Sequence, residues 1–196
     1  MSRRTITTRP VATTDTGHLT EFLYDDGTNA DCVVCAGHAG DVEPGTGDLA
    51  VELATRVPGV TCWAAFGYDD GGAYDAWHPP SKAITPEEYP LLGRIADRGF
   101  DTVVSLHGLG DDEVIVGGRA AESTRATVRD RLDDAISVPV RSVSDGPYAG
   151  VHPDNFVNWL AADCGGLQLE LGETARMSDA EALLDVLEGV VRDELR

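Results

Sequence analysis

The sequence predicts an α/β fold: a mixed, largely parallel, twisted sheet flanked by helices on both faces. Short apolar and β-branched runs alternate along the chain with segments of helical periodicity, and no internal repeat interrupts this alternation. The chain has 196 residues, of which 42% are hydrophobic, so it can bury one sizeable core. We therefore expect a single domain over residues 1–196.

The strands are predicted from apolar runs bounded by turn residues. Residues 1–18 are polar and threonine-rich, so we expect an extended or loosely ordered lead-in there. A short edge strand is expected over residues 19–24, and a second short strand over residues 73–78 ends at Pro79-Pro80. The remaining predicted strands span residues 32–36, 60–66, 101–106, 113–116, 138–143 and 167–171.

The helices are predicted from capping residues and from apolar residues at helical spacing. Asp48 is a candidate N-cap for the first helix, and Pro86 occupies the first helical position of the second. Ser178 and Glu181 have the spacing of a capping box at the start of the last helix. The predicted helices span residues 49–56, 85–98, 120–135, 156–160 and 178–195.

The chain is strongly acidic, with 34 Asp and Glu against 15 Lys and Arg and a formal net charge of -19. Such a surface repels phosphate, so we expect no nucleic-acid partner. The acidic residues are scattered, which favours a solvated acidic coat on a protein from a high-salt cytoplasm. An acidic surface that binds a basic partner is the alternative.

No apolar run approaches the roughly 18 residues of a membrane-spanning helix, so we expect no membrane partner. No apolar stretch follows Arg3-Arg4, so we expect a cytoplasmic protein, or one from which a leader was removed. Cys32 and Cys35 have the spacing of a redox or zinc motif. On a strand, however, their side chains point to opposite faces, which favours buried core thiols. The sequence does not predict an oligomeric state.

A candidate metal site follows the predicted strand over residues 32–36. The stretch AGHAGDVEPGTGD places His38 and Glu43 on a glycine-rich turn, and a catalytic zinc takes three such protein ligands plus a water. We expect His107 to be the third ligand. It follows another apolar strand, and the carboxyl ends of strands in an open α/β sheet form the usual site. From spacing alone, an accidental pairing of His38 and Glu43 remains the alternative.

Four stretches, in order, resemble the poly-gamma-glutamate hydrolase family, which comprises zinc amidases of phages and bacteria. They are AGHAGDVEPGTGD, SLHGLGDDEVIVGG, YAGVHPDNFVNW and GGLQLELGETAR. The first looks like the family segment HGGxIExGT. The resemblance implies a zinc-carboxypeptidase-like fold and one Zn²⁺ per chain, held by His38, Glu43 and His107. It also implies that Glu170 is the general base.

Two substrate classes fit this resemblance. Hydrolysis of gamma-glutamyl amide bonds, in poly-gamma-glutamate or its oligomers, is the first. N-acyl or N-formyl amino acids, cleaved by a small-molecule deacylase with the same zinc site, are the second. A third hypothesis is a non-catalytic metal-binding protein. Ala39, Asp41 and Ile115 depart from the family pattern, and these departures leave the substrate preference open.

Substrate contacts are expected from four further residues. Arg176 matches a family arginine, whose planar guanidinium suits a substrate carboxylate, and Arg119 would add to a local basic patch. His152 and Asn155 lie in a loop expected near the site. We interpret His78 as a core histidine whose hydrogen bonds are satisfied, although it could instead face the site from a strand end.

Overall fold

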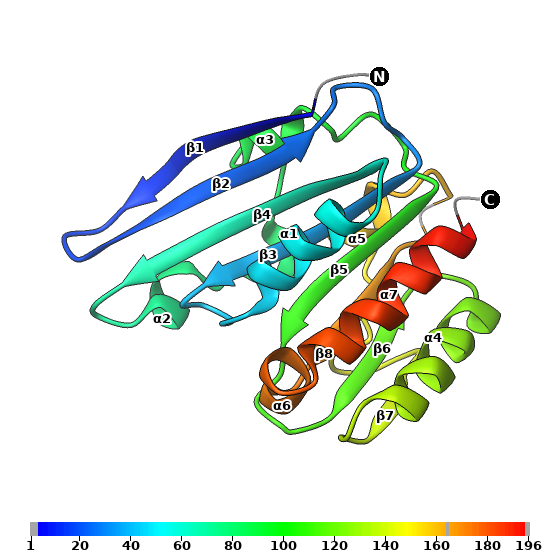
Figure 1. The fold of residues 1–196 in the computed structure, drawn as a ribbon. Coiled ribbons are helices and arrows are strands. Elements are labelled where there is room, and N and C mark those ends of the chain that lie inside the picture. The colour runs from blue at the N-terminus through cyan, green and yellow to red at the C-terminus, as the bar shows by residue number, and fades with distance from the viewer. Residues whose placement is uncertain (1–3, 164, 195–196) are drawn as a thin grey trace.

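An eight-stranded mixed sheet with the strand order β1-β2-β4-β3-β5-β8-β6-β7 organises the chain (Figure 1). The computed structural model describes residues 4–163 and 165–194. The strands are β1 (Thr5–Thr13), β2 (Gly17–Asp25), β3 (Cys32–Gly40), β4 (Val60–Asp69), β5 (Thr102–Gly108), β6 (Val114–Gly118), β7 (Val140–Ser142) and β8 (Leu167–Leu171). The predicted α/β fold class is therefore confirmed.

Parallel strands form the middle of the sheet. Strands β4, β3, β5 and β8 run in the same direction, whereas β2 and β6, on either side of them, run antiparallel to their neighbours β4 and β8. Strand β3 is buried along almost its whole length because helices or loops cover both of its faces, which explains its continuous apolar sequence. The carboxyl ends of β3, β5 and β8 consequently lie side by side.

Helices cover both faces of the sheet (Figure 1). One core lies under α1 (Thr46–Arg56), α4 (Glu122–Ala135), α6 (Glu173–Met177) and α7 (Ala180–Glu194). The other lies under α2 (Ala73–Trp77), the 3₁₀ turn η1 (Ser81–Ala83), α3 (Pro90–Gly93) and α5 (Phe156–Trp159). No helix in the described ranges is long and apolar enough to cross a membrane.

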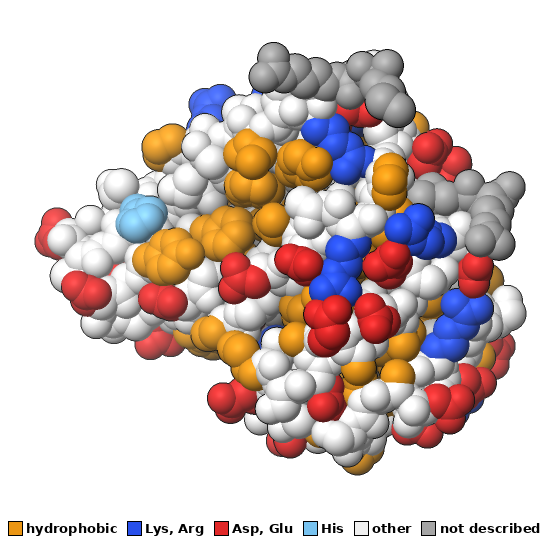
Figure 2. Space-filling model, viewed as in Figure 1, with side chains coloured by type: hydrophobic (Ala, Val, Ile, Leu, Met, Phe, Trp, Pro, Cys, Tyr) orange, Lys and Arg blue, Asp and Glu red, His pale blue; other side chains and the backbone are white. Residues whose placement is uncertain are grey.

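Charged side chains of both signs are spread over the face that carries α1, α4 and α7 (Figure 2). Arg56 there contacts Glu52, Glu181 and Asp185. These are exposed pairs, each contributing little to stability.

Of the two alternatives expected for residues 1–18, an extended or a loosely ordered lead-in, the described residues bear out the extended one, because they form strand β1. Strand β1 pairs antiparallel with β2 along nearly its full length, with a register shift between Pro10 and Ala12. Its threonines are β-branched and suit a pleated surface, although they give no apolar alternation. Strand β2 is confirmed near residues 19–24, but β1 rather than β2 forms the edge of the sheet.

The predicted strand over residues 73–78 is wrong, because this segment forms α2. Strand β4 before it already has β2 on one side and β3 on the other, so no sheet edge is available for pairing. Instead, Trp77 is buried against Gly67 at the end of β4, where a Cβ atom would lie 2.9 Å from the indole ring.

The predicted helix over residues 85–98 is reduced to the single turn of α3, from Pro90 to Gly93. Proline inside a helix lacks the N–H that would bond four residues back, and its ring clashes with that carbonyl. Pro90 therefore starts a helix rather than continuing one. The buried Glu21 side chain completes this start by accepting hydrogen bonds from the backbone N–H groups of Leu91 and Leu92.

The other predicted elements are present with shifted ends. The N-cap of α1 is Gly45 in the left-handed region, not Asp48, and α6 is not predicted by the sequence. The last predicted helix corresponds to α7, while its final predicted residue, Leu195, lies outside the described residues. Cys32 and Cys35 are buried and unbonded, as expected, and burial raises the pKa of Cys32 to about 12.

Candidate metal centre and active site

His38 reaches the carboxyl edge of the sheet through an irregularity in β3. The register with β4 shifts between Ala36 and Ala39, so that His38 lies within the shift. Such bulges redirect side chains, and they concentrate next to active sites. His38 is 2% exposed, and its Nε2 lies 2.8 Å from the Pro79 carbonyl oxygen. A carbonyl can only accept, so Nε2 carries the proton and Nδ1 keeps a free lone pair.

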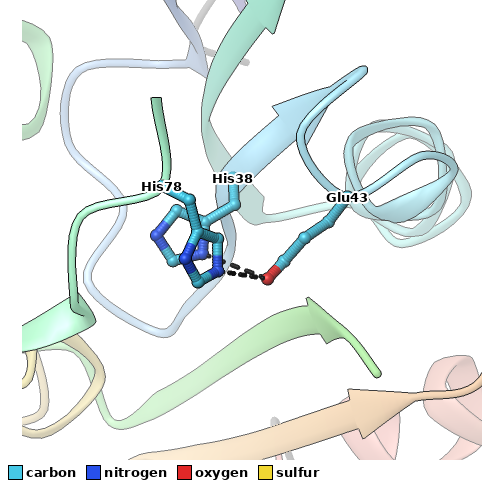
Figure 3. A group of neighbouring side chains, drawn as sticks. All are labelled: His38, Glu43 and His78. Carbon is cyan, nitrogen blue, oxygen red and sulfur yellow. Dashed lines mark hydrogen bonds and ion pairs between the residues drawn. The ribbon is translucent and has the colours of Figure 1, made fainter. Parts of the chain in front are cut away.

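Glu43 lies in the turn between β3 and α1. Its backbone N–H donates to the His38 carbonyl at 2.8 Å, while its own carbonyl accepts from the Thr46 hydroxyl at 2.8 Å. Gly40 and Gly45 have φ values of 77° and 91°, which allow the chain to fold back here. The glycine-rich turn thus directs the Glu43 carboxylate toward His38, as Figure 3 shows.

His107, in β5, joins these two residues from the neighbouring strand. Its Nδ1 lies 3.3 Å from Nδ1 of His38 and 3.6 Å from Oε2 of Glu43. The other ring nitrogen, Nε2, is 2.9 Å from the Ser105 hydroxyl, which fixes the orientation of the ring. The structure therefore brings together the three residues that the sequence analysis selected as zinc ligands.

His78, at the carboxyl end of α2, is a fourth member of this cluster. Its Nε2 lies 3.1 Å from Oε1 of Glu43 (Figure 3). Its ring lies between the Tyr74 and His38 rings, with centroid distances of 4.1 and 4.2 Å. His38, Glu43 and His78 also form a compact set of potential metal donors. The sequence interpretation of His78 as a core histidine is wrong. The available signal was its position directly before Pro79-Pro80, in a loop rather than within an element.

The donor atoms are arranged as ligands of a metal ion rather than as hydrogen-bond partners of one another. Nδ1 of His38 lies 3.3 Å from Oε1 of Glu43, and the buried Oε2 of Glu43 accepts no hydrogen bond. A lone pair and a carboxylate oxygen at this distance repel unless a cation lies between them. Around a tetrahedral zinc with bonds of about 2.0–2.1 Å, neighbouring donors lie about 3.3–3.4 Å apart. Nδ1 of His38 lies at that spacing both from Oε1 of Glu43 and from Nδ1 of His107, while Nδ1 of His107 is 3.6 Å from Oε2 of Glu43.

Electrostatics in this cluster favour an ionised Glu43 and a neutral His38. Burial acts to raise the pKa of Glu43, but contacts with His107, His38 and His78 outweigh it and hold the pKa far below its usual range. Burial lowers the pKa of His38, against the opposing influence of Glu43. For His107, burial also acts to lower the pKa, but the contact with Glu43 outweighs it and raises the pKa. A carboxylate and a neutral imidazole are the forms that bind metal.

Glu170, in β8, lies beside the cluster and is the register partner of His107. Burial raises the pKa of Glu170, the charge of Glu43 adds to the rise, and His107 and Gln168 oppose it. Its Oε1 accepts a 2.7 Å hydrogen bond from the Gln168 amide, whose oxygen accepts a 2.8 Å bond from Asn155. A chain of side-chain hydrogen bonds thus orients this carboxylate.

Asn155 and Gln168 therefore act on Glu170 rather than lying free in the groove. Asn155 is the N-cap of α5, accepting from the Val157 N–H, so its contact with Gln168 ties that helix to β8. Gln168 is not among the site residues predicted from the sequence. The sequence signal for Gln168 was its position two residues before Glu170. Residues two apart on a strand share a face, so the two side chains lie on the same side of β8.

A groove with a volume of about 510 Å³ opens beside Glu170. His152 and Asn155, which the sequence places in a loop expected near the site, both line it. His152 is exposed, and its Nδ1 accepts from the Asp154 N–H. The side chain of Asn158 donates to the carbonyls of Gly150 and His152 and so holds this loop in place.

The two arginines selected from the sequence lie outside the groove, although Nη1 of Arg176 lies close to Gly108, next to Glu43. Arg119 follows β6, which runs antiparallel to β8, with Gly118 opposite Leu167 at the start of β8. It therefore lies at the opposite end of β8 from Glu170. Arg176 is closer to the cluster, but its Nη1 donates to the Pro44 carbonyl at 2.5 Å, outside the residues that line the groove. Neither arginine lines the groove beside Glu170.

Comparison with known proteins identifies the family. A model of the poly-gamma-glutamate hydrolase family matches residues 13–183. A search of curated proteins finds no match. Among solved structures, a bacteriophage poly-gamma-glutamate hydrolase is similar at 20% identity, with a TM-score of 0.71 over 93% of this chain and 90% of that one.

Two further solved structures share this fold. The zinc-free form of YNDL is 22% identical, with a TM-score of 0.74 over 89% of this chain and 90% of that one. A protein described as a carboxypeptidase A from Shewanella denitrificans is 16% identical, with a TM-score of 0.57 over 96% of this chain and 65% of that one. The fold is thus zinc-carboxypeptidase-like. With the family match and this site, the chain belongs to the poly-gamma-glutamate hydrolase family and is a metal-dependent hydrolase.

Proposed function

We propose that this protein hydrolyses gamma-glutamyl amide bonds, in poly-gamma-glutamate or its oligomers, with one zinc ion per chain. The observation that carries the proposal is the cluster at the carboxyl edge of the sheet. There two histidine Nδ1 atoms face the Glu43 carboxylate, one oxygen of which is buried without a partner. The family match and the similar bacteriophage hydrolase favour the gamma-glutamyl substrate class.

We assign the zinc to His38, Glu43 and His107. These three are at most 5% exposed, and the distal nitrogens of both histidines contact fixed oxygen atoms, as the ligands of a metal centre usually do. His78 is less suited because its side chain is 26% exposed, and a fourth protein ligand would close the position that a catalytic centre leaves open. Bound zinc would supply Lewis acidity toward a water molecule and the scissile carbonyl.

Glu170 moves the proton in this proposal. Its carboxylate takes a proton from the attacking water as the new C–O bond forms, and gives it to the amide nitrogen as the C–N bond breaks. A raised pKa suits both steps, because it makes the Glu170 carboxylate a stronger base toward the attacking water and keeps the resulting acid protonated closer to neutral pH until it donates to the leaving nitrogen. Gln168 holds the carboxylate in the orientation for both transfers.

The first test is direct. Zinc-loaded protein is incubated with poly-gamma-glutamate, and polymer length is followed by size-exclusion chromatography. We expect shortening of the polymer, and we expect Glu170→Gln to abolish it while retaining zinc by elemental analysis. Unchanged polymer together with turnover of an N-acylglutamate would replace the proposal by the deacylase alternative. Wild-type protein that neither contains nor takes up zinc would remove the metal assignment.

A further inference from the structure

The groove beside Glu170 is bordered by two loops whose side chains have no part in the cluster. One comprises residues 80–82, which follow His78, and the other residues 146–152. Each loop is fixed to the site. Pro79 accepts the hydrogen bond from His38, and Asn158 holds the second loop through the carbonyls of Gly150 and His152. Side chains on these loops therefore have a defined position relative to Glu170.

Lys82 contributes the groove's permanent positive charge. It is the only lysine of the chain, and no Arg lines the groove. Within residues 4–163 and 165–194, its side chain has no recorded acidic partner, whereas Arg98 and Arg141 each pair with a carboxylate. Lys82 and the candidate general base Glu170 line the same groove, in a chain with a net charge of -19. Lys82 would offset local repulsion of an anionic substrate.

Tyr148 supplies a second, independent feature. Among the described residues, it is the one non-glycine residue with positive φ, at 65°. Such backbone strain persists only where the surroundings enforce it, and it clusters at binding and catalytic sites. Here Gln168 donates to the Tyr148 carbonyl at 3.4 Å, and Gly117 packs against the same backbone. The side chain of Tyr148 remains about half exposed at the groove.

We propose that Lys82 and Tyr148 form the subsite that binds the free carboxylate of the substrate residue next to the scissile amide. An ammonium group and a phenolic hydroxyl both donate to a carboxylate, and a gamma-linked glutamate carries one such group on every residue. This assignment rests on the proposed function and replaces Arg119 and Arg176 as the substrate clamp. It makes the groove selective for an anionic amide substrate.

Paired substrates test the proposal. The zinc-loaded enzyme is assayed with a gamma-linked glutamate oligomer and with the same oligomer bearing carboxamides in place of the free carboxylates. We expect Lys82→Met to raise KM for the acidic oligomer about 3- to 10-fold, with kcat within about 2-fold. KM for the neutral oligomer should not change. Tyr148→Phe should raise KM for the acidic oligomer less strongly. Lys82→Arg keeps the positive charge, so KM for the acidic oligomer should stay close to the wild-type value.

Arg119→Met is the matched control, because it removes an exposed cation at the other end of the sheet. It should leave both KM values unchanged. If the enzyme cleaves the acidic oligomer and Lys82→Met behaves like this control, the subsite assignment is wrong while the proposed function stands.

If the wild type cleaves neither oligomer, the proposed function fails, and calorimetry then decides the subsite separately. The acidic oligomer is titrated into zinc-loaded Glu170→Gln protein, with and without Lys82→Met. Binding that weakens on loss of Lys82 supports the subsite, and equal or absent binding overturns it.

Discussion

Two buried glutamates, Glu21 and Glu43, show how differently one fold uses a carboxylate. Glu21 is fully buried in β2, and its oxygens accept hydrogen bonds from the Trp63 indole and from two backbone N–H groups of α3. Glu43 is almost as buried, yet it faces three histidines and keeps one oxygen without a partner.

The difference identifies the site. The hydrogen bonds from the Trp63 indole and from two backbone N–H groups compensate the burial of the Glu21 carboxylate, so it needs no ligand. The Glu43 cluster contains more acceptors than donors, and a buried group in this condition is costly unless a ligand completes it. The first position stabilises the protein, and the second is available to a metal.

The largest expected effect is that of Glu43→Gln. The amide is nearly isosteric but carries no charge, so the substitution should remove zinc binding and lower hydrolysis by about 10³-fold, since a catalytic metal contributes several kcal/mol. Elemental analysis and the polymer assay measure the two effects. If Glu43→Gln protein binds zinc stoichiometrically, the assignment of Glu43 as a zinc ligand, and with it the contrast with Glu21, is wrong.

Glu21→Gln should have the opposite signature. In either orientation the amide NH₂ group would replace an oxygen that accepts from a backbone N–H, that of Leu91 at Oε2 or those of Leu91 and Leu92 at Oε1, costing about 2–3 kcal/mol in the free energy of unfolding. Zinc content and kcat should remain those of the wild type. Urea denaturation with parallel metal analysis tests this, and an unchanged unfolding midpoint would contradict the structural role of Glu21.

Gln168→Leu should reduce kcat by about 10- to 100-fold, the range found when residues that orient catalytic groups are removed. Glu170 would lose the hydrogen bond that orients it but keep its charge, so zinc content and KM should change little. Steady-state kinetics separate the two parameters. A rise in KM at constant kcat would instead place Gln168 in substrate binding.

The smallest expected effect concerns Asp25, a third buried carboxylate, whose charge is balanced by Arg98 through two 2.7 Å hydrogen bonds. Burial acts to raise the pKa of Asp25, but the contact with Arg98 outweighs it and lowers the pKa. A lowered folded-state pKa adds stability above the unfolded value of about 4, and this contribution disappears as pH falls through the folded value.

Asp25→Asn should therefore cost about 1–2 kcal/mol near neutral pH and progressively less below about pH 4. Thermal unfolding of both proteins across pH 3–7 measures the difference. A gap that stays constant over this range would show that the charge of Asp25 contributes nothing.

Much of the fold was predictable because its signals are local. Strands β3 and β5 follow from largely apolar runs, β8 follows from the alternation of leucine with polar residues, and the helix α4 follows from its periodic stripe. The lost helix over residues 85–98 also had a local signal, since Pro90 cannot occupy a helix interior. For residues 73–78, no local signal argued against a strand, because the absence of a free sheet edge is a property of the assembled sheet.

The site was predictable where it depends on strand ends and not where it depends on strand direction or loop paths. His38 and His107 meet because β3 and β5 are parallel neighbours. Arg119 also follows a strand, but β6 runs the other way, and sequence does not reveal that direction. His78 reaches Glu43 only through the course of the loop after α2, and Lys82 and Tyr148 reach the groove in the same way.

The outer strand β1 has a consequence for how this protein behaves in concentrated solution. A strand at the edge of a sheet exposes unpaired backbone groups that can recruit another chain and start aggregation. Here Pro10 lacks an N–H group, and the register shift beside it twists the strand. Arg9 adds a charge to the same stretch. Replacing Pro10 and Arg9 with valine would leave a flat apolar edge next to the exposed Ile6, and would favour the formation of fibrils.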